Sequence, residues 1–376
     1  MFMNVSGEWK KRGSELISRM PSAMLPIGIK NGTDVGDFRV EMALDPDLEK
    51  QVDRRRQQGR IGYFQMAARV INPLETIGTT APRSAIKLNE IMHCAKLWSM
   101  LRRSTTSRVL SLSATEAHAD LTRTAVPAAT VQVQHMGQRL DLNTLRCTGT
   151  DGPYTLVLGD EGGGEREPRT RALTQLAQVL VALRSLEAGG ALVLKVLDTS
   201  HTSVVTRTMW LLCQAFSGQV LLFKPAAVRP CSTELFVVAT GATPTQDRTE
   251  LERTALPWFL RMISGGTTED TAEGFQERTL QPPHEFCTYM QYVHLHFEGA
   301  RHVNVRLALQ VTKSLVEQHP MLRRDELRKL QEACGTCSTL STFANEYHQK
   351  FPMPGVQQEQ QNMQKLLESL DQLVPQ

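Results

Sequence analysis

Two apolar runs that each carry one charge constrain the fold of this chain more than any other feature. The first run, Ala191 to Leu197, follows Gly189-Gly190 and contains Lys195. The second, Leu235 to Ala239, begins directly after Glu234. Near-continuous apolar runs of this length are typical of strands that are covered on both faces. A charge on such a strand costs free energy unless it is paired or used, because burial penalises the charged form.

A regular alternation of strand and helix patterns surrounds these runs. The pattern predicts strands at residues 108–112, 130–136, 154–158, 191–197, 220–223 and 235–239, and helices at 171–187, 204–216 and 251–263. The helix over 171–187 carries one apolar stripe, formed by Leu173, Leu176, Val179, Leu180, Leu183 and Leu186. Alternating strands and helices predict an α/β protein with a doubly wound, Rossmann-like sheet. In such sheets, ligands bind at the carboxyl ends of the strands.

Two further charges stand at places that fit a site in this fold. Asp160 follows the strand over 154–158 and precedes Gly162 to Gly164, and Lys87 lies in a helix that opens after Pro82. Each has an ordinary explanation, since Asp is common in turns and a helical Lys usually faces solvent. The two strand charges could likewise form a salt bridge. For Asp160, the alternative is a role in a ligand site, which its place at the carboxyl end of a strand and the downstream Lys195 and Glu234 favour.

The residues between the strand charges resemble those of a known family. Lys224-Pro225 and Arg229-Pro230 stand between Lys195 and Glu234. This order resembles the FtsJ/RrmJ family of S-adenosylmethionine-dependent RNA ribose 2′-O-methyltransferases, and most closely its eukaryotic and viral mRNA-cap branch. The sequence departs from the family pattern at Val228 and Thr233, where the family has serine.

The resemblance implies a catalytic tetrad of Lys87, Asp160, Lys195 and Glu234. Lys195 would be the general base that takes the ribose hydroxyl proton, with a pKa lowered towards neutrality by Lys87 and by partial burial. Asp160 and Glu234 would orient the lysines and the hydroxyl. Tight pairing of these carboxylates with Lys195 would act in the opposite direction and hold it protonated.

The resemblance also implies S-adenosylmethionine as the cofactor. Its expected contacts are Ser111, Ser113, Ala114, Thr115, Asp141 and Asp160, with Glu116 or Asp120 as further candidates for the methionine amino group. The family has a Gly-rich loop after the first strand, which lets the backbone approach the cofactor. Here the stretch 111–120 contains no glycine, and the second strand ends near His135 rather than at an acid. The alternative is therefore an inactive methyltransferase-fold protein that acts as a scaffold or assembly factor in an RNA–protein complex.

RNA is the partner that the resemblance implies, with capped mRNA 5′ ends as the expected substrate. Arg83, Lys224 and Arg229 would contact it. The formal charge of +3 is compatible with a nucleic-acid partner but is too small to argue for one. A plain RNA-binding module is the weakest alternative, because it leaves Lys195 and Glu234 unexplained.

Composition along the 376 residues predicts three regions. These are an N-terminal extension at 1–60, a Rossmann-like methyltransferase core at 61–284, and a helical C-terminal region with a tail at 285–376. The C-terminal region is expected to contain helices at 303–318 and 324–334. The Gln-rich tail, amphipathic over 363–373, is a candidate for docking on a protein partner or on this chain.

Cysteine use and hydropathy limit the cellular setting. Seven scattered cysteines do not form a disulfide framework, and no apolar run is long enough to span a membrane or to act as a signal peptide. We therefore expect a reducing compartment, nuclear or cytoplasmic, with mitochondria as an alternative. Cys334 and Cys337 have the spacing of half a zinc site without a second pair, so no metal is predicted. His294 and His296 would share one face of a strand and are expected to pack.

Overall fold

The computed structural model describes residues 23–26, 47–57, 61–70, 81–104, 106–112, 116–134, 151–160, 168–197, 203–264, 281–318 and 346–354. These residues form a sheet with the strand order β1-β6-β7-β5-β4-β2-β3. Its strands are β1 (Ala23–Pro26), β2 (Arg108–Leu112), β3 (Thr130–Gln134), β4 (Tyr154–Gly159), β5 (Leu186–Val196), β6 (Val220–Lys224) and β7 (Leu235–Thr240). The helices are α2 (Leu48–Gln57), α3 (Ile61–Val70), α5 (Arg83–Cys94), α6 (Leu97–Arg103), α7 (Ala117–Ala125), α9 (Pro168–Ser185), α10 (Ser203–Ala215), α11 (Thr245–Ile263) and α12 (His284–Gln318).

One side of the sheet is parallel and the other side is antiparallel. Strands β3, β2, β4 and β5 run in one direction, as strands joined by crossover helices do. Strand β7 is antiparallel to both β5 and β6, and β1 is antiparallel to β6. The predicted α/β class with a doubly wound, Rossmann-like sheet is confirmed.

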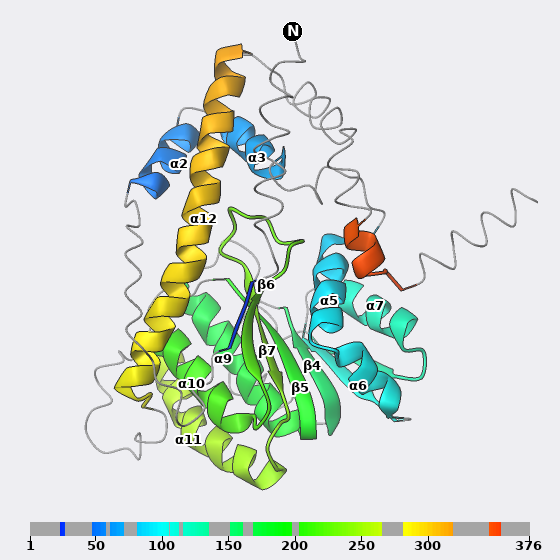
Figure 1. Ribbon diagram of the computed structural model, residues 1–376. Coiled ribbons are helices and arrows are strands. Elements are labelled where there is room, and N and C mark those ends of the chain that lie inside the picture. Colours follow the sequence, from blue (N-terminus) through cyan, green and yellow to red (C-terminus); the bar gives the residue numbers. More distant parts are fainter. Residues whose placement is uncertain are drawn as a thin grey trace, which may run out of the picture.

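Helices cover both faces of the sheet (Figure 1). Helices α5, α6 and α7 lie on one face, and α9, α10 and α11 lie on the other. The buried side chains of each strand alternate between the two layers, as the two-residue period of a strand requires. In β5, for example, Ala191 and Val193 pack towards α5 and α6, whereas Leu192 and Leu194 pack towards α9.

Helix α9 is buried almost all round rather than along the one stripe predicted for it. Its residues from Ala172 to Leu183 are all buried, because α9 lies between the sheet and helices α10 and α11. Gly159 permits a close approach to β4. A Cβ atom there would lie 2.5 Å from Gln178 Oε1 and 2.8 Å from Leu194 Cδ1.

Several element boundaries differ from the sequence prediction. Leu186, expected on the apolar stripe of the helix, is the first residue of β5, so that strand begins five residues earlier than predicted. Leu186 already pairs with Tyr154 of β4, and the register between the two strands shifts between Tyr154 and Leu156. Helix α11 begins at Thr245, six residues before the prediction.

The C-terminal region begins with one long helix. Helix α12 spans His284–Gln318, so the prediction of a strand face for His294 and His296 is wrong and both lie in a helix. Its first half joins the core of the sheet through Phe286, Met290, Val293 and Phe297. Its second half packs against α2 and α3 (Figure 1). The predicted region boundaries stay a prediction. The helix expected over 324–334, the Cys334–Cys337 pair and the amphipathic stretch 363–373 lie outside the described residues.

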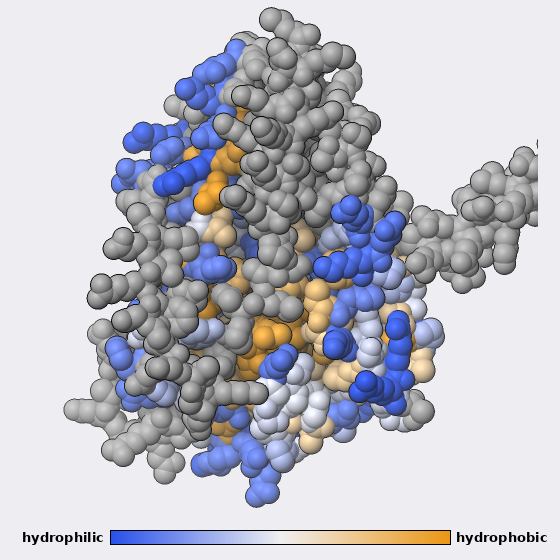
Figure 2. Space-filling model, viewed as in Figure 1, coloured by the Kyte–Doolittle hydropathy of each residue, from blue (hydrophilic) through white to orange (hydrophobic). Residues whose placement is uncertain are grey.

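The surface of the described residues is mixed in polarity. On the face shown in Figure 2, hydrophobic residues gather in the middle, over the region of β6 and β7, and hydrophilic residues predominate towards α2 and towards α5 to α7. Among the helices described, none combines the length and the hydropathy needed to cross a membrane.

Candidate functional site

Sheet register brings three of the four predicted charges to one edge. Strands β4 and β5 are parallel with Gly159 beside Leu194, so Asp160 and Lys195 follow at neighbouring positions. Strand β7 is antiparallel to β5, with Phe236 beside Lys195 and Leu235 beside Val196. The start of β7, preceded by Glu234, therefore lies at the carboxyl ends of β4 and β5.

The fourth charge comes from the helix that covers this edge. Side chains two residues apart in a strand point to the same face. Lys195 therefore shares a face with Ala191 and Val193, and Glu234 shares a face with Phe236. This is the face that α5 covers. Lys87 lies in the first turn and a half of α5. Helix α5 packs on this side through Ala85, Leu88 and Ile91, which places Lys87 over the strand ends.

Two short ion pairs hold the four side chains together. Lys87 Nζ lies 2.7 Å from both carboxylate oxygens of Glu234. Lys195 Nζ lies 2.8 Å from Asp160 Oδ1, an ion pair at contact distance. All four side chains are largely buried, with 12 to 17% of each exposed. Pairs this well shielded are screened little by salt.

Burial and pairing move the pKa values of the two lysines in opposite directions. Burial lowers the pKa of Lys87, and Glu234 opposes this only in part, while Arg83 and Lys195 add to the lowering. Burial also acts to lower the pKa of Lys195, but the carboxylates of Asp160 and Glu234 together raise it above its ordinary value. This pairing therefore holds Lys195 protonated at neutral pH, which is the alternative stated for tight pairing rather than the expected pKa near neutrality.

A histidine that the sequence did not single out joins this group. His118 Nε2, from α7, lies 3.5 Å from Asp160 Oδ2, and the His118 side chain is almost fully buried. Burial lowers its pKa, Asp160 raises it, and Lys195 and Lys87 lower it further, so that the ring is neutral at pH 7. Asp160 is therefore shared between His118 and Lys195. Nothing in the local sequence pattern distinguishes His118, because only the packing of α7 brings it to β4.

The predicted cofactor contacts fall partly outside the described residues. Ser113, Ala114, Thr115 and Asp141 are not among the described residues, and their roles stay predictions. Ser111 is described: it is the fourth residue of β2, fully buried, and its Oγ has no hydrogen-bond partner among the described residues.

The two acidic candidates for the methionine amino group have another partner. Glu116 Oε2 and Asp120 Oδ1 lie 3.4 Å and 3.0 Å from Arg123 Nη1 in ion pairs at the surface of α7. Both side chains are more than half exposed, whereas His118, between them in sequence, is turned into the protein. The structure therefore gives these acids a surface role.

The predicted RNA contacts are placed in two settings. Arg83 opens α5 close enough to Lys87 to lower its pKa, and Arg229 is half-buried in the loop between β6 and β7. Lys224 is mostly buried, and its ammonium group donates to the carbonyl oxygens of Ser232 and Glu234. Burial lowers the pKa of Lys224 to about 8 despite the carboxylates nearby. Its observed contacts support the loop, and RNA contact by these three residues stays a prediction.

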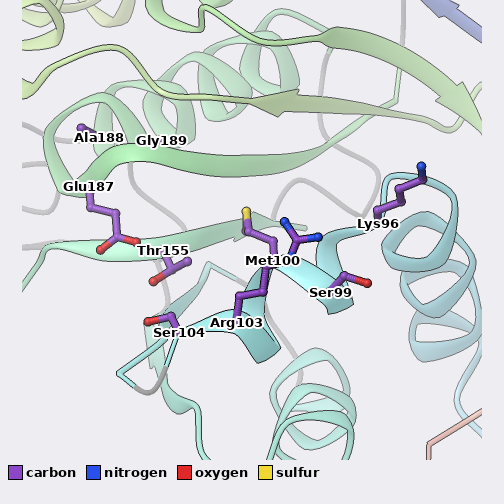
Figure 3. Close-up of a pocket in the computed structure, with 9 residues that line it drawn as sticks. All are labelled: Lys96, Ser99, Met100, Arg103, Ser104, Thr155, Glu187, Ala188 and Gly189. Atoms are coloured by element: carbon purple, nitrogen blue, oxygen red, sulfur yellow. The ribbon is translucent and has the colours of Figure 1, made fainter.

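A separate hollow of about 450 Å³ lies away from these charges (Figure 3). It is lined by Lys96 and Arg103 at α6 and by Thr155 and Glu187 near the starts of β4 and β5. The tetrad lies at the opposite, carboxyl edge of the same strands, so this hollow is not part of the candidate site. Among the described side chains, no group of three or more His, Cys, Asp or Glu is arranged to hold a metal ion.

One protein-family model matches the part of the chain that carries three of the four charges. Residues 127–242 match the FtsJ-like methyltransferase family model. The matched FtsJ-like region covers just under a third of the chain, from β3 to the end of β7. It contains Asp160, Lys195 and Glu234, whereas Lys87 and β2 precede it. No curated protein matches the chain. The FtsJ-like region supports methyltransferase activity, and the cap branch goes beyond what this match covers.

The residues at the carboxyl ends of β2 and β4 fit the cofactor that this family uses. The buried, unpartnered hydroxyl of Ser111 offers a donor and an acceptor at the strand edge where α/β sheets bind nucleotide-like ligands. The carboxylate of Asp160 offers negative charge beside it, which suits a cationic cofactor. Ser111 and Asp160 would therefore hold S-adenosylmethionine.

Proposed function

We propose that this protein is an S-adenosylmethionine-dependent RNA ribose 2′-O-methyltransferase that acts on capped mRNA 5′ ends. The observation that carries the proposal is the pair of ion pairs, Lys87–Glu234 and Lys195–Asp160, at the carboxyl edge of β4 and β5. Structural salt bridges alone would not require two cations and two anions to be buried together at the ligand edge of the sheet. The FtsJ-like region supports the same assignment.

In the proposed reaction, one side chain of the protein removes the hydroxyl proton and the others hold the two lysines in position. S-adenosylmethionine, when bound, supplies an electrophilic methyl group and a positive charge. Lys195 accepts the proton of the ribose 2′-hydroxyl and needs a free amine to do so. Asp160, which His118 contacts from α7, holds Lys195 in place, and the bidentate contact of Glu234 holds Lys87. Asp160 and Glu234 raise the pKa of Lys195, so any weakening of their hold would lower it towards the range in which Lys195 acts as a base.

The direct test uses the purified full chain with labelled methyl donor. Capped and uncapped transcripts of the same sequence are incubated in parallel, and the methylated nucleotide is identified after digestion. The proposal expects label on a ribose 2′-oxygen of the capped transcript. Label on both transcripts would support methyltransferase activity and contradict the proposed requirement for a cap. Absence of label from both, with the donor shown to bind, would contradict the proposal.

The pH dependence of the reaction should follow the pairing of Lys195. Because Asp160 raises the pKa of Lys195, Asp160→Asn lowers it, and the free amine appears at lower pH. We expect the rising limb of the rate against pH to shift to lower pH in Asp160→Asn, with a lower maximal rate. The measurement is kcat from pH 6 to 10 in both proteins, pH values chosen to bracket the ordinary lysine and histidine ranges. If the rising limb of the pH–rate profile is at the same pH in both proteins, Lys195 is not the general base.

A second candidate function is favoured by specific features. The stretch 111–120 has no glycine, and the ring of His118 occupies buried space against Asp160. Side chains at these places narrow the space that a cofactor would need, which favours an inactive scaffold or assembly factor in an RNA–protein complex. Titration calorimetry with S-adenosylmethionine separates the two candidates, since the scaffold predicts no heat of binding.

The cellular setting is part of the same proposal. Four cysteines are described, Cys94, Cys213, Cys231 and Cys287, and all are free thiols. Burial raises the pKa of Cys213 and of Cys231 to about 12, so both thiols are unreactive at neutral pH. Free thiols support a reducing compartment, nuclear or cytoplasmic, with mitochondria as the alternative.

A further inference from the structure

A buried carboxylate on α5 connects three segments that are far apart in sequence. Glu90 is fully buried, one turn after Lys87. Its Oε1 accepts a hydrogen bond from the backbone N–H of Ala226 at 2.7 Å. Its Oε2 accepts from the N–H of Ala227 at 3.1 Å and from the hydroxyl of Tyr347 at 2.7 Å. Each of these three partners donates, and Glu90 accepts all three hydrogen bonds, as an ionised carboxylate does.

The first connection fixes the loop that leads to Glu234. Ala226 and Ala227 follow β6, at the beginning of the loop that ends at β7. The other end of this loop is held by Lys224, which donates to the carbonyl oxygens of Ser232 and Glu234. Glu90 therefore ties the start of the loop to the same helix that presents Lys87, while Lys224 ties its end.

The second connection brings the described C-terminal segment, residues 346–354, onto α5. In Figure 1 the orange-red helical turn at 346–350 lies beside α5. Tyr347 and Phe351 pack with Ile86 and Ala227, and Asn89 Nδ2 donates to the carbonyl oxygens of Phe351 and Pro352 at 3.1 Å and 3.2 Å. Asn89 Oδ1 in turn accepts from Trp98 Nε1 at 3.2 Å. The segment contacts α5 over two turns, through buried polar groups that all have partners.

We propose that the Glu90 cluster, formed by Glu90, Ala226, Ala227 and Tyr347, is a positioning device for the Lys87–Glu234 pair. The inference rests on the proposed methyltransferase function. Lys87 belongs to α5, and Glu234 belongs to the loop that Glu90 holds, so one carboxylate sets the distance between the two elements that meet at 2.7 Å. Residues 346–354 complete the catalytic unit although they lie more than 100 residues beyond the FtsJ-like region.

The Lys87–Glu234 pair needs such a device because its two residues belong to a helix and to a loop that lie far apart in the sequence. An active site loses rate steeply when a reacting group moves by about 1 Å. A loop of ten residues without regular secondary structure, such as 225–234, does not hold a charged side chain that tightly by itself. Three hydrogen bonds to one buried carboxylate supply the missing rigidity, because breaking any of them leaves a buried polar group unsatisfied.

The test compares two neighbouring substitutions in the full chain. Tyr347→Phe removes one hydroxyl from the cluster and keeps the ring in its apolar setting. Glu346→Gln changes the adjacent exposed residue and is the matched control. Amide hydrogen exchange is followed in α5 and in residues 225–234, and kcat and KM for RNA are measured on the same preparations. Glu90→Gln is a second, stronger variant, because its amide N–H₂ would face a donor.

Tyr347→Phe is expected to speed amide exchange in both α5 and residues 225–234 by about tenfold or more. This factor corresponds to the free energy of one hydrogen bond to a charged acceptor. It is also expected to lower kcat by about tenfold with KM unchanged, while Glu346→Gln behaves as wild type. Faster exchange confined to residues 346–354 would overturn the proposal, as would an unchanged kcat with a loosened α5. If the wild type does not methylate RNA but Tyr347→Phe loosens both segments, the coupling stands and the proposed function fails.

Discussion

Replacing Lys195 by methionine is expected to abolish methyl transfer while the protein stays folded. Methionine has a similar length and keeps the apolar packing of β5, but it removes the amine that takes the ribose proton. Loss of a general base costs about a hundredfold to ten-thousandfold in rate. Here the ion pair with Asp160 is lost as well, so kcat should fall by at least about a hundredfold. Single-turnover methylation of RNA measures the effect, and circular dichroism monitors the fold.

A matched lysine on the surface serves as the control for this substitution. Lys313 lies in the second half of α12, is exposed and is 3.9 Å from Glu317. Lys313→Met should leave the methylation rate unchanged, because the residue is on an element that does not contribute to the tetrad. Activity of Lys195→Met equal to that of Lys313→Met would exclude Lys195 from the chemistry and favour the structural explanation of its charge.

Replacing Arg248 by methionine is expected to destabilise the fold without acting through the site. Arg248 is fully buried in α11, and its guanidinium donates to the carbonyl oxygens of Leu183, Leu186 and Thr243. Two of these carbonyls lie where α9 ends and β5 begins, and the third lies just before α11. One side chain therefore supplies hydrogen bonds to backbone groups at the ends of three elements. Methionine would leave the carbonyls buried and unsatisfied, at a cost of about 3 to 5 kcal/mol in the free energy of unfolding.

Chemical denaturation of the full chain measures this loss. The control is Arg253→Met, in the same helix, because Arg253 is exposed and pairs only with its neighbour Glu250 among the contacts observed. Its unfolding midpoint should match that of the wild type. Equal midpoints for Arg248→Met and Arg253→Met would show that water or repacking satisfies the three carbonyls.

Strands were easier to predict from the sequence than the elements that cover them. The prediction for β2 coincides with the structure, and those for β6 and β7 differ by one residue, because a short apolar run bounded by polar residues has few alternatives. The start of β5 was missed. Leu186 continues the helical stripe of α9, and only its pairing with Tyr154 makes it a strand residue.

The tetrad charges were identified by their match, in order and strand context, to the FtsJ/RrmJ family, whereas their neighbours His118 and Glu90 were not identified. Glu90 had a signal in the sequence, since it is a charge among the apolar residues Ile86, Ile91 and Met92 of one helix. Its partners come from 136, 137 and 257 residues away, and no local pattern points to them. The sequence left the direction of the pKa shift of Lys195 open, because it depends on the distance to Asp160.

The sequence by itself determined the α/β class and the strand run that carries Lys195, because these follow from local periodicity. The set of four charges came from the resemblance of the sequence to the FtsJ/RrmJ family. Only the tertiary structure decided which acid pairs with which lysine, that His118 shares Asp160, and that residues 346–354 pack on the helix of Lys87. Electrostatic and hydrogen-bond energies depend on distances of a few ångströms between segments hundreds of residues apart, and such distances exist only once the chain has folded.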